Sequence, residues 1–151
     1  MKSFMKKRSI PAETARKLSL GDRERGGFLA ETLQGGLAAI SLSADPSVTS
    51  AISNDMGEGL VFAQQVLSLG RQGDVLLAIS TSGNAENVIN AAVTAAAVGM
   101  KVVGLTGRTG GSLSGFCDIL IAVPADATHE VQELHLPVYH TLCAMAEDCF
   151  F

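Results

Sequence analysis

Short apolar runs alternate along the chain with longer segments in which apolar residues recur at helical spacing. Glycine, proline or hydroxyl-rich turns bound each short run, which indicates strands buried on both faces. We expect four strands, at 37–42, 75–79, 101–105 and 119–123. Helices are expected at 47–53 (a single turn), 60–69, 85–99, 112–116 and 128–150, the last with Pro137 inside it. This rhythm predicts an α/β fold, a three-layer α/β/α sandwich around a parallel sheet.

The first 34 residues follow a different pattern and are expected to form exposed helices, broken at Pro11, at Gly21 and at the Gly26-Gly27 pair. Eight of the eleven Lys and Arg residues lie within residues 1–25. Such a segment could contact nucleic acid, but acidic residues dilute its charge and no aromatic residues interleave with it. We therefore interpret residues 1–34 as a solvated helical segment and residues 35–151 as the α/β core, and we do not expect direct nucleic-acid binding.

Length and composition indicate one domain with a sizeable core, because the chain has 151 residues, of which 47% are hydrophobic and only 5% aromatic. The odd count of cysteines (Cys117, Cys143 and Cys149) and their spacing argue against a disulfide framework. No apolar run approaches the roughly 18 residues needed to span a membrane, and no secretory signal is evident. We expect a cytoplasmic protein without a membrane partner.

The strongest chemical signal is the sequence Ser80-Thr81-Ser82-Gly83-Asn84, which follows one predicted strand and precedes a predicted helix. Ligands of parallel sheets bind at the carboxyl ends of strands. A helix start there presents unpaired N–H groups and a dipole that favour an anionic oxygen cluster such as phosphate. The alternative is a hydroxyl-rich helix cap with no ligand.

Several motifs resemble those of sugar isomerase (SIS) domains. Residues 73–84 (GDVLLAISTSGN), residues 99–107 (GMKVVGLTG) and the Gly110-Gly111 pair resemble the core of the family. Residues 53–55 (SND) and 131–140 (VQELHLPVYH) are similar to its phosphoheptose isomerase branch. The resemblance covers residues 37–151 and implies a flavodoxin-like strand order and a phosphorylated sugar as ligand.

Carried over residue by residue, the resemblance implies a site for that sugar. The hydroxyl turn would hold the phosphate, other residues would contact the sugar chain, and one histidine would act as acid/base or as a zinc ligand. These residues are Ser80, Thr81, Ser82, Gly83 and Asn84 for the phosphate, Asn54, Asp55 and Gln132 for the sugar, and His140 for proton transfer. The implied reaction moves a proton between adjacent carbons through an enediol. We interpret His129 and His135 as hydrogen-bonded core residues.

Zinc bound by Gln132 and His140 is also implied by the resemblance. The two residues are eight positions apart, about 12 Å along an ideal helix. Both would reach one ion only with a break at Pro137 or with ligands from different subunits.

The sequence also departs from the family. The family's first strand, its Gly-Asn-Gly-Gly-Ser loop and the helix that carries the expected Glu base have no counterpart, so we expect a chain that starts late, and residues 12–34 look like an insertion. Ala85 stands where the isomerases carry a further serine. A strand missing from the middle of the sheet would leave backbone groups unpaired, so we expect residues 1–151 to be unstable or aggregation-prone and to lack turnover.

Two functions follow from the resemblance. The first is a phosphoheptose isomerase that interconverts sedoheptulose 7-phosphate and a mannoheptose 7-phosphate. The alternative is a non-catalytic SIS module that senses a phosphosugar or binds a protein such as a replication initiator. The apolar final helix could pack at a subunit interface, and the resemblance implies a homo-oligomer, a dimer or a tetramer.

Overall fold

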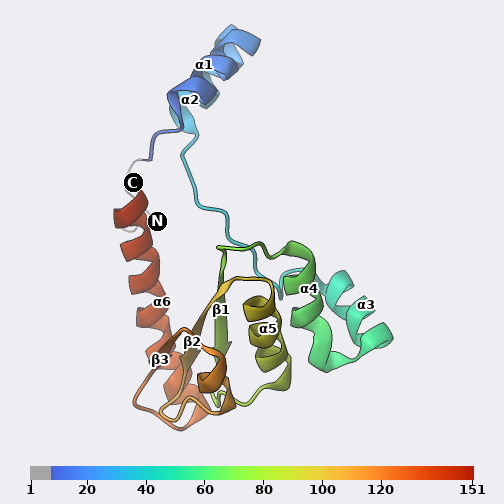
Figure 1. The fold of residues 1–151 in the computed structure, drawn as a ribbon. Helices are drawn as coiled ribbons and strands as arrows, with labels where there is room; N and C mark the ends of the chain where they lie inside the picture. Colours follow the sequence, from blue (N-terminus) through green and yellow to red (C-terminus); the bar gives the residue numbers. More distant parts are fainter. Residues whose placement is uncertain (1–7) are drawn as a thin grey trace. The chain divides into compact units, whose positions relative to one another are not determined.

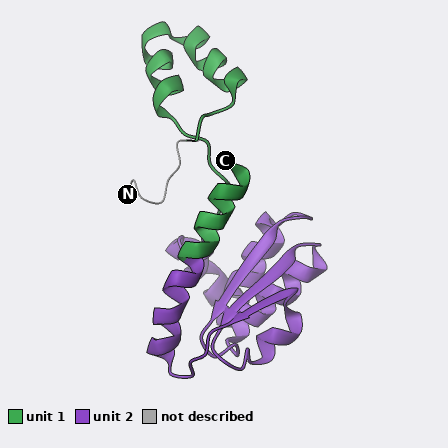
Figure 2. Ribbon diagram, turned by 90° about the vertical axis from the view of Figure 1, so that its left-hand side faces the viewer, with its two compact units in different colours: residues 1–40, 140–151 green, residues 41–139 purple. Residues whose placement is uncertain are grey.

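The computed structural model describes residues 8–151, which divide into two compact units (Figure 2). One unit spans Ser41–Tyr139, and the other joins the described part of residues 1–40 to residues 140–151. The helix expected at the very start of the chain lies outside the described residues. No helix within residues 8–151 has both the length and the hydropathy that crossing a bilayer requires.

A three-stranded parallel sheet forms the centre of the unit Ser41–Tyr139. Its strands β1 (Val75–Ser80), β2 (Lys101–Thr106) and β3 (Ile119–Ala122) lie in the order β1-β2-β3. Val75 pairs with Lys101, and Val103 pairs with Ile119. These strands are rich in Val, Leu and Ile, whose side chains pack well on a pleated surface. The α/β class and the parallel sheet are therefore confirmed.

Helices lie on both faces of the sheet (Figure 1). On one face, α4 (Val61–Leu69) and α5 (Glu86–Ala97) enclose a core in which Ala92, Ala95 and Val102 are fully buried. On the other face, the first turns of α6 (Thr128–Phe150) pack around Val131. Two short 3-10 helices complete the unit, η1 (Glu58–Leu60) and η2 (Ser112–Phe116).

Helix α3 (Pro46–Met56) is longer than the single turn predicted at 47–53. The carboxylate of Asp45 accepts hydrogen bonds from the N–H groups of Ser47 at 2.9 Å and Val48 at 3.1 Å. This cap satisfies two of the donors that a helix start leaves unpaired, so the helix begins one residue after Asp45.

The strand predicted at 37–42 is wrong, and the sheet has three strands instead of four. Residues 37–41 belong to no helix or strand. The carbonyl of Leu42 accepts a hydrogen bond from the Gln65 side chain of α4 at 2.9 Å instead of entering a ladder. An apolar run becomes a strand only where it pairs with a neighbouring strand, and residues 37–41 pair with none in the described part of the chain.

The other unit contains a helical hairpin, α1 (Ala12–Gly21) and α2 (Arg23–Thr32). The break predicted at Gly26-Gly27 is wrong, because α2 runs through both glycines. A Cβ atom at Gly26 would collide with the carbonyl group of Leu18 on α1. Glycine is thus required for the close crossing of the two helices and does not end the second.

The ends of this hairpin are tied to the last turn of α6 inside the same unit. Ser9 and Gln34 form an antiparallel bridge. The Arg8 guanidinium lies 5.4 Å from the centre of the Phe151 ring, and its Nε is 3.5 Å from the Glu147 carboxylate. The Arg8 and Glu147 side chains are largely shielded from solvent.

Candidate functional site

The hydroxyl turn (residues 80–84) follows β1 directly and is shaped by its own side chains. The Oγ of Ser80 accepts the N–H of Gly83 at 3.1 Å, and the Oγ of Ser82 accepts the N–H of Asn84 at 3.2 Å. Each hydroxyl is an acceptor in these bonds and keeps its O–H to donate. The turn therefore holds its shape while still offering donors.

A second loop, which contains Gly110 and Gly111, supports the hydroxyl turn. The carbonyl of Gly83 accepts the N–H of Leu113 at 2.9 Å, and the side-chain oxygen of Asn84 accepts the N–H of Ser112 at 2.9 Å. Gly83 has φ +68°, and a Cβ atom there would collide with the Gly110 carbonyl. Only glycine fits this position.

The start of α5 carries unpaired donors beside this turn. Ala85 is the N-cap residue, and no side chain caps the helix. Within residues 8–151, the N–H groups of Ala85, Glu86 and Asn87 have no acceptor. The hydroxyls of the turn do not cap α5 in the described part of the chain, so the hydroxyl-rich helix cap of the alternative is absent. These donors and the helix dipole suit an anion.

Asn54 and Asp55 lie exposed near the end of α3, in the same unit as the hydroxyl turn. The next element, η1, packs against α5, where Asn90 donates to the carbonyl of Gly59 at 2.9 Å. The end of α3 is thereby held through η1 against α5, the helix whose first N–H groups are unpaired.

Gln132 lies exposed in the second turn of α6, next to Val131. A Cβ atom at Gly107 would approach Val131 to 3.1 Å, and the N–H of Gly107 donates to the Thr81 carbonyl at 2.9 Å. Gln132 therefore lies on a helix turn that packs next to Gly107, the residue that is hydrogen-bonded to the hydroxyl turn. His140 is exposed and belongs to the other unit, so its role stays a prediction from the resemblance.

The interpretation of the two other histidines as hydrogen-bonded core residues is wrong in part. His129 is exposed in the first turn of α6. His135 is buried, with 4% of its surface exposed, but its Nε2 has no hydrogen-bond partner in the described part of the chain. The two residues are six positions apart on the helix and lie on different faces of it, His129 toward solvent and His135 toward the interior.

The residues that this chain supplies do not by themselves fit a zinc ion. Within residues 8–151, no three His, Cys, Asp or Glu side chains lie close enough together to hold a metal. Helix α6 is also helical on both sides of Pro137, so the break that would let Gln132 and His140 reach one ion is absent.

Cysteine chemistry does not contribute to this site. The Cys117 thiol donates to the Leu113 carbonyl at 3.2 Å, and burial raises its pKa. A raised pKa keeps the thiol protonated and a weak nucleophile.

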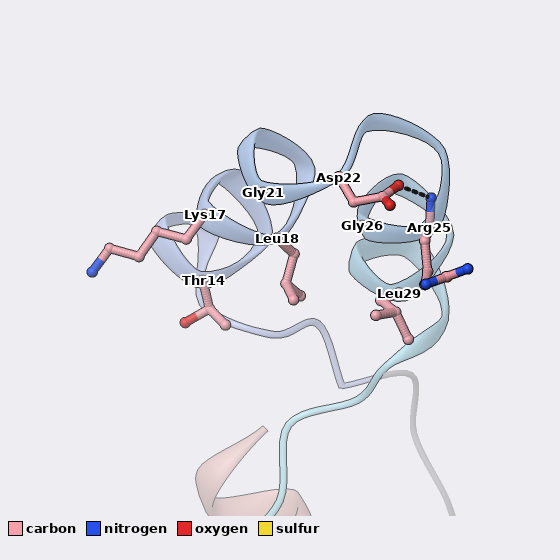
Figure 3. Close-up of a pocket in the computed structure, with 8 residues that line it drawn as sticks. All are labelled: Thr14, Lys17, Leu18, Gly21, Asp22, Arg25, Gly26 and Leu29. Carbon is pink, nitrogen blue, oxygen red and sulfur yellow. Dashed lines mark hydrogen bonds between the residues drawn. The ribbon is translucent and has the colours of Figure 1, made fainter.

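An open crevice of about 390 Å³ lies between α1 and α2 (Figure 3). Leu18 and Leu29 line it, with Lys17 and Arg25 among the charged residues around it. It contains none of the predicted site residues. The crevice is therefore separate from the site that the resemblance implies.

The model of a known protein family, described as "SIS domain", matches residues 24–107, more than half of the chain. The chain belongs to the SIS domain family. This SIS protein is 46% identical over 114 residues to the phosphoheptose isomerase of a Nitratiruptor species, covering 76% of this chain and 61% of that protein. It is 49% identical over 112 residues to the phosphoheptose isomerase of Helicobacter hepaticus, covering 74% and 57%.

Solved structures agree with the sequence relatives. A phosphoheptose isomerase from Francisella tularensis aligns with TM-score 0.68 and 35% identity over 87% of this chain and 67% of that one. A phosphoheptose isomerase from Neisseria gonorrhoeae aligns with TM-score 0.65 and 45% identity, over 75% and 61%. This SIS protein spans about three fifths of the length of the curated relatives that it matches.

Proposed function

We propose that this SIS protein binds a phosphorylated sugar with the phosphate at the hydroxyl turn. The observation that carries the proposal is the set of unpaired N–H groups at Ala85, Glu86 and Asn87, beside hydroxyls that keep their protons. A phosphate accepts several hydrogen bonds at once and is favoured at a helix start by the dipole. Ala85 supplies no hydroxyl, so the phosphate has one donor fewer than a serine would give, a difference on the order of 1 kcal/mol.

We infer that the reaction served is the isomerisation of a ketose and an aldose phosphate of the phosphoheptose type. Sedoheptulose 7-phosphate and a mannoheptose 7-phosphate are the expected pair. The names of the relatives favour this reaction over a non-catalytic sensing or protein-binding module.

In this mechanism the phosphate anchors one end of the open sugar chain. Asn54, Asp55 and Gln132 hydrogen-bond its hydroxyls, and His140 moves a proton near the carbonyl as the enediol forms and collapses. Histidine suits this step because its ordinary pKa lies near neutrality. Anchoring contributes by holding the reacting carbons near the proton-transfer group.

A coupled assay with sedoheptulose 7-phosphate tests the proposal together with a binding titration. Saturable binding with turnover that is lost in the His140→Ala variant supports an isomerase. Binding without turnover supports the phosphosugar site and restricts residues 1–151 to binding. Absence of both binding and turnover contradicts the proposal.

We also propose that the protein works as a homo-oligomer in the cytoplasm. The last turns of α6 support an interface, because Met145 is 62% exposed and Phe150 is 65% exposed. Large apolar side chains clustered at a surface favour protein contacts. Size-exclusion chromatography with light scattering tests this, and a monomer at micromolar concentration contradicts it.

A further inference from the structure

Arg108 joins two loops at the carboxyl end of the sheet. It follows β2 and reaches the segment between β3 and α6 through three hydrogen bonds. Its backbone N–H donates to the Ala125 carbonyl at 3.0 Å, its Nη2 donates to the Pro124 carbonyl at 2.8 Å, and its Nε donates to the Asp126 carboxylate at 3.0 Å. Neither charged residue belongs to the site implied by the resemblance.

Gly107, the residue before Arg108, lies in close contact with three segments: the hydroxyl turn, the loop before α6 and the second turn of α6. A Cβ atom there would lie 2.7 Å from the Thr81 carbonyl oxygen, 3.0 Å from that of Ala125 and 3.1 Å from a methyl group of Val131. The hydroxyl turn, the loop before α6 and the second turn of α6 therefore meet at one point. Arg108 holds this junction from the solvent side.

The charge of Arg108 is directed at Asp126 and not at the hydroxyl turn. In the unit Ser41–Tyr139 only Arg71, Lys101 and Arg108 are basic apart from histidine. Arg71 precedes β1 and Lys101 begins β2, at the opposite end of the sheet from the site. Arg108 is thus the one Lys or Arg of this unit at the carboxyl end, and an acid already pairs with it.

We propose that Arg108 and Asp126 form a positioning pair that sets the first turns of α6, and with them Gln132, against the hydroxyl turn. The proposal rests on the proposed function, because Gln132 is taken to contact the sugar chain. The proposal distinguishes the recognition of two parts of one ligand, the sugar chain and the phosphate. The pair affects recognition of the sugar chain and leaves recognition of the phosphate unchanged.

Two ligands separate these parts in solution. Inorganic phosphate probes the hydroxyl turn alone, whereas sedoheptulose 7-phosphate also probes the sugar contacts. Affinities of the full chain for both are measured by NMR titration for the unaltered protein and for the Arg108→Gln and Asp126→Asn variants. We expect each variant to lose about three- to tenfold in affinity for the sugar phosphate, the size of an ion pair strengthened by added hydrogen bonds, with phosphate affinity unchanged.

Two further variants decide whether the pair itself is responsible. Exchange of the two charges in the Arg108→Asp/Asp126→Arg double variant should recover part of the lost affinity. The matched control is Lys101→Gln, which removes the partner of Asp118 at the other end of β2, where the two atoms are 2.6 Å apart. This control should leave both affinities unchanged.

The possible failures are distinguishable. Equal losses for phosphate and sugar phosphate in Arg108→Gln would mean that Arg108 acts on the phosphate itself, and would overturn the positioning role. Unchanged affinities in both variants would overturn it as well, while leaving the proposed function intact. If the unaltered chain binds neither ligand, the proposed function fails and the role of the pair fails with it.

Discussion

Gly83 occupies the most restricted backbone position of the hydroxyl turn, with φ +68° and the Gly110 carbonyl where a Cβ would lie. We expect Gly83→Ala to destabilise the fold by about 2 kcal/mol or more and to abolish phosphate binding, since the turn must open. Gly73→Ala is the matched control, because Gly73 has φ +90° but no described neighbour lies within 4 Å of a Cβ atom placed there. It should cost about 1 kcal/mol and keep binding. Denaturant unfolding and phosphate titration measure both effects, and equal behaviour of the two variants would contradict this account.

Glu86 places a carboxylate in the first turn of α5, where the proposed phosphate would bind. Removing the charge in Glu86→Gln should raise phosphate affinity about two- to fivefold at low salt, because a like charge is lost. The same change should lower stability by about 0.3–1 kcal/mol without ligand, because the carboxylate favours the helix start. Glu31→Gln, an equal charge change in the other unit, controls for net charge. A fall in affinity would show that Glu86 assists the ligand.

Asp118 links the start of β2 to the loop before β3. Its hydrogen bond from Lys101, and a second from the Val102 N–H at 2.8 Å, hold its pKa below the ordinary 3.8. A lowered pKa means that the native state favours the ionised acid. The stabilisation that ionised Asp118 gives the fold is therefore present above pH 3.8, and it is lost as the pH falls through the lowered pKa of the native state. Asp118→Asn should therefore be less stable than the unaltered chain at pH 7, with the difference shrinking at pH 2. A difference that stays constant in denaturation curves from pH 7 to pH 2 would contradict this.

At the scale of elements, β1 is an edge strand of the described sheet, and its six residues include no charge and no proline. The Lys101 N–H bonds to the Asp74 carbonyl, so by alternation Val75, Leu77 and Ile79 direct their backbone groups away from β2. Their side chains are 61%, 41% and 46% exposed. Edge strands that lack charge, proline or a bulge invite pairing with other chains.

We therefore expect the chain to self-associate through β1, and Leu77→Lys to suppress this. A charge on an edge strand opposes pairing because it must be desolvated against the next strand. Leu67→Lys is the control, since Leu67 is 57% exposed on α4, away from the edge. Light scattering over a range of concentrations measures the effect. Equal suppression by both lysines would mean that general charge matters, and not the edge.

The sequence was sufficient for the three strands that pair with one another. The runs at β1, β2 and β3 are consecutive strands of one sheet, so local pattern and tertiary pairing agree. The pattern failed at 37–42, because that run pairs with no strand of the described sheet. It failed at Gly26, because only the crossing with Leu18 explains a glycine inside a helix.

The candidate site was predictable in part for the same reason. The hydroxyl turn is contiguous in sequence, so its residues could be named directly. The Gly110–Gly111 loop supports this turn, and Arg108 is linked to Asp126. Both interactions join residues that are 18 or more positions apart, so only the fold brings them together. The glycine pair was the one signal in the sequence for that support.

For the whole molecule, the central claim is that phosphate recognition belongs to the hydroxyl turn and the start of α5. Isothermal titration calorimetry of residues 1–151 with sedoheptulose 7-phosphate, and with the same sugar lacking phosphate, tests it most directly. We predict saturable binding of the phosphorylated sugar, at least roughly tenfold weaker binding of the free sugar because charge-assisted hydrogen bonds are lost, and loss of binding in Gly83→Ala. Equal affinity for the two sugars, or undiminished binding by Gly83→Ala in a folded protein, would contradict the account.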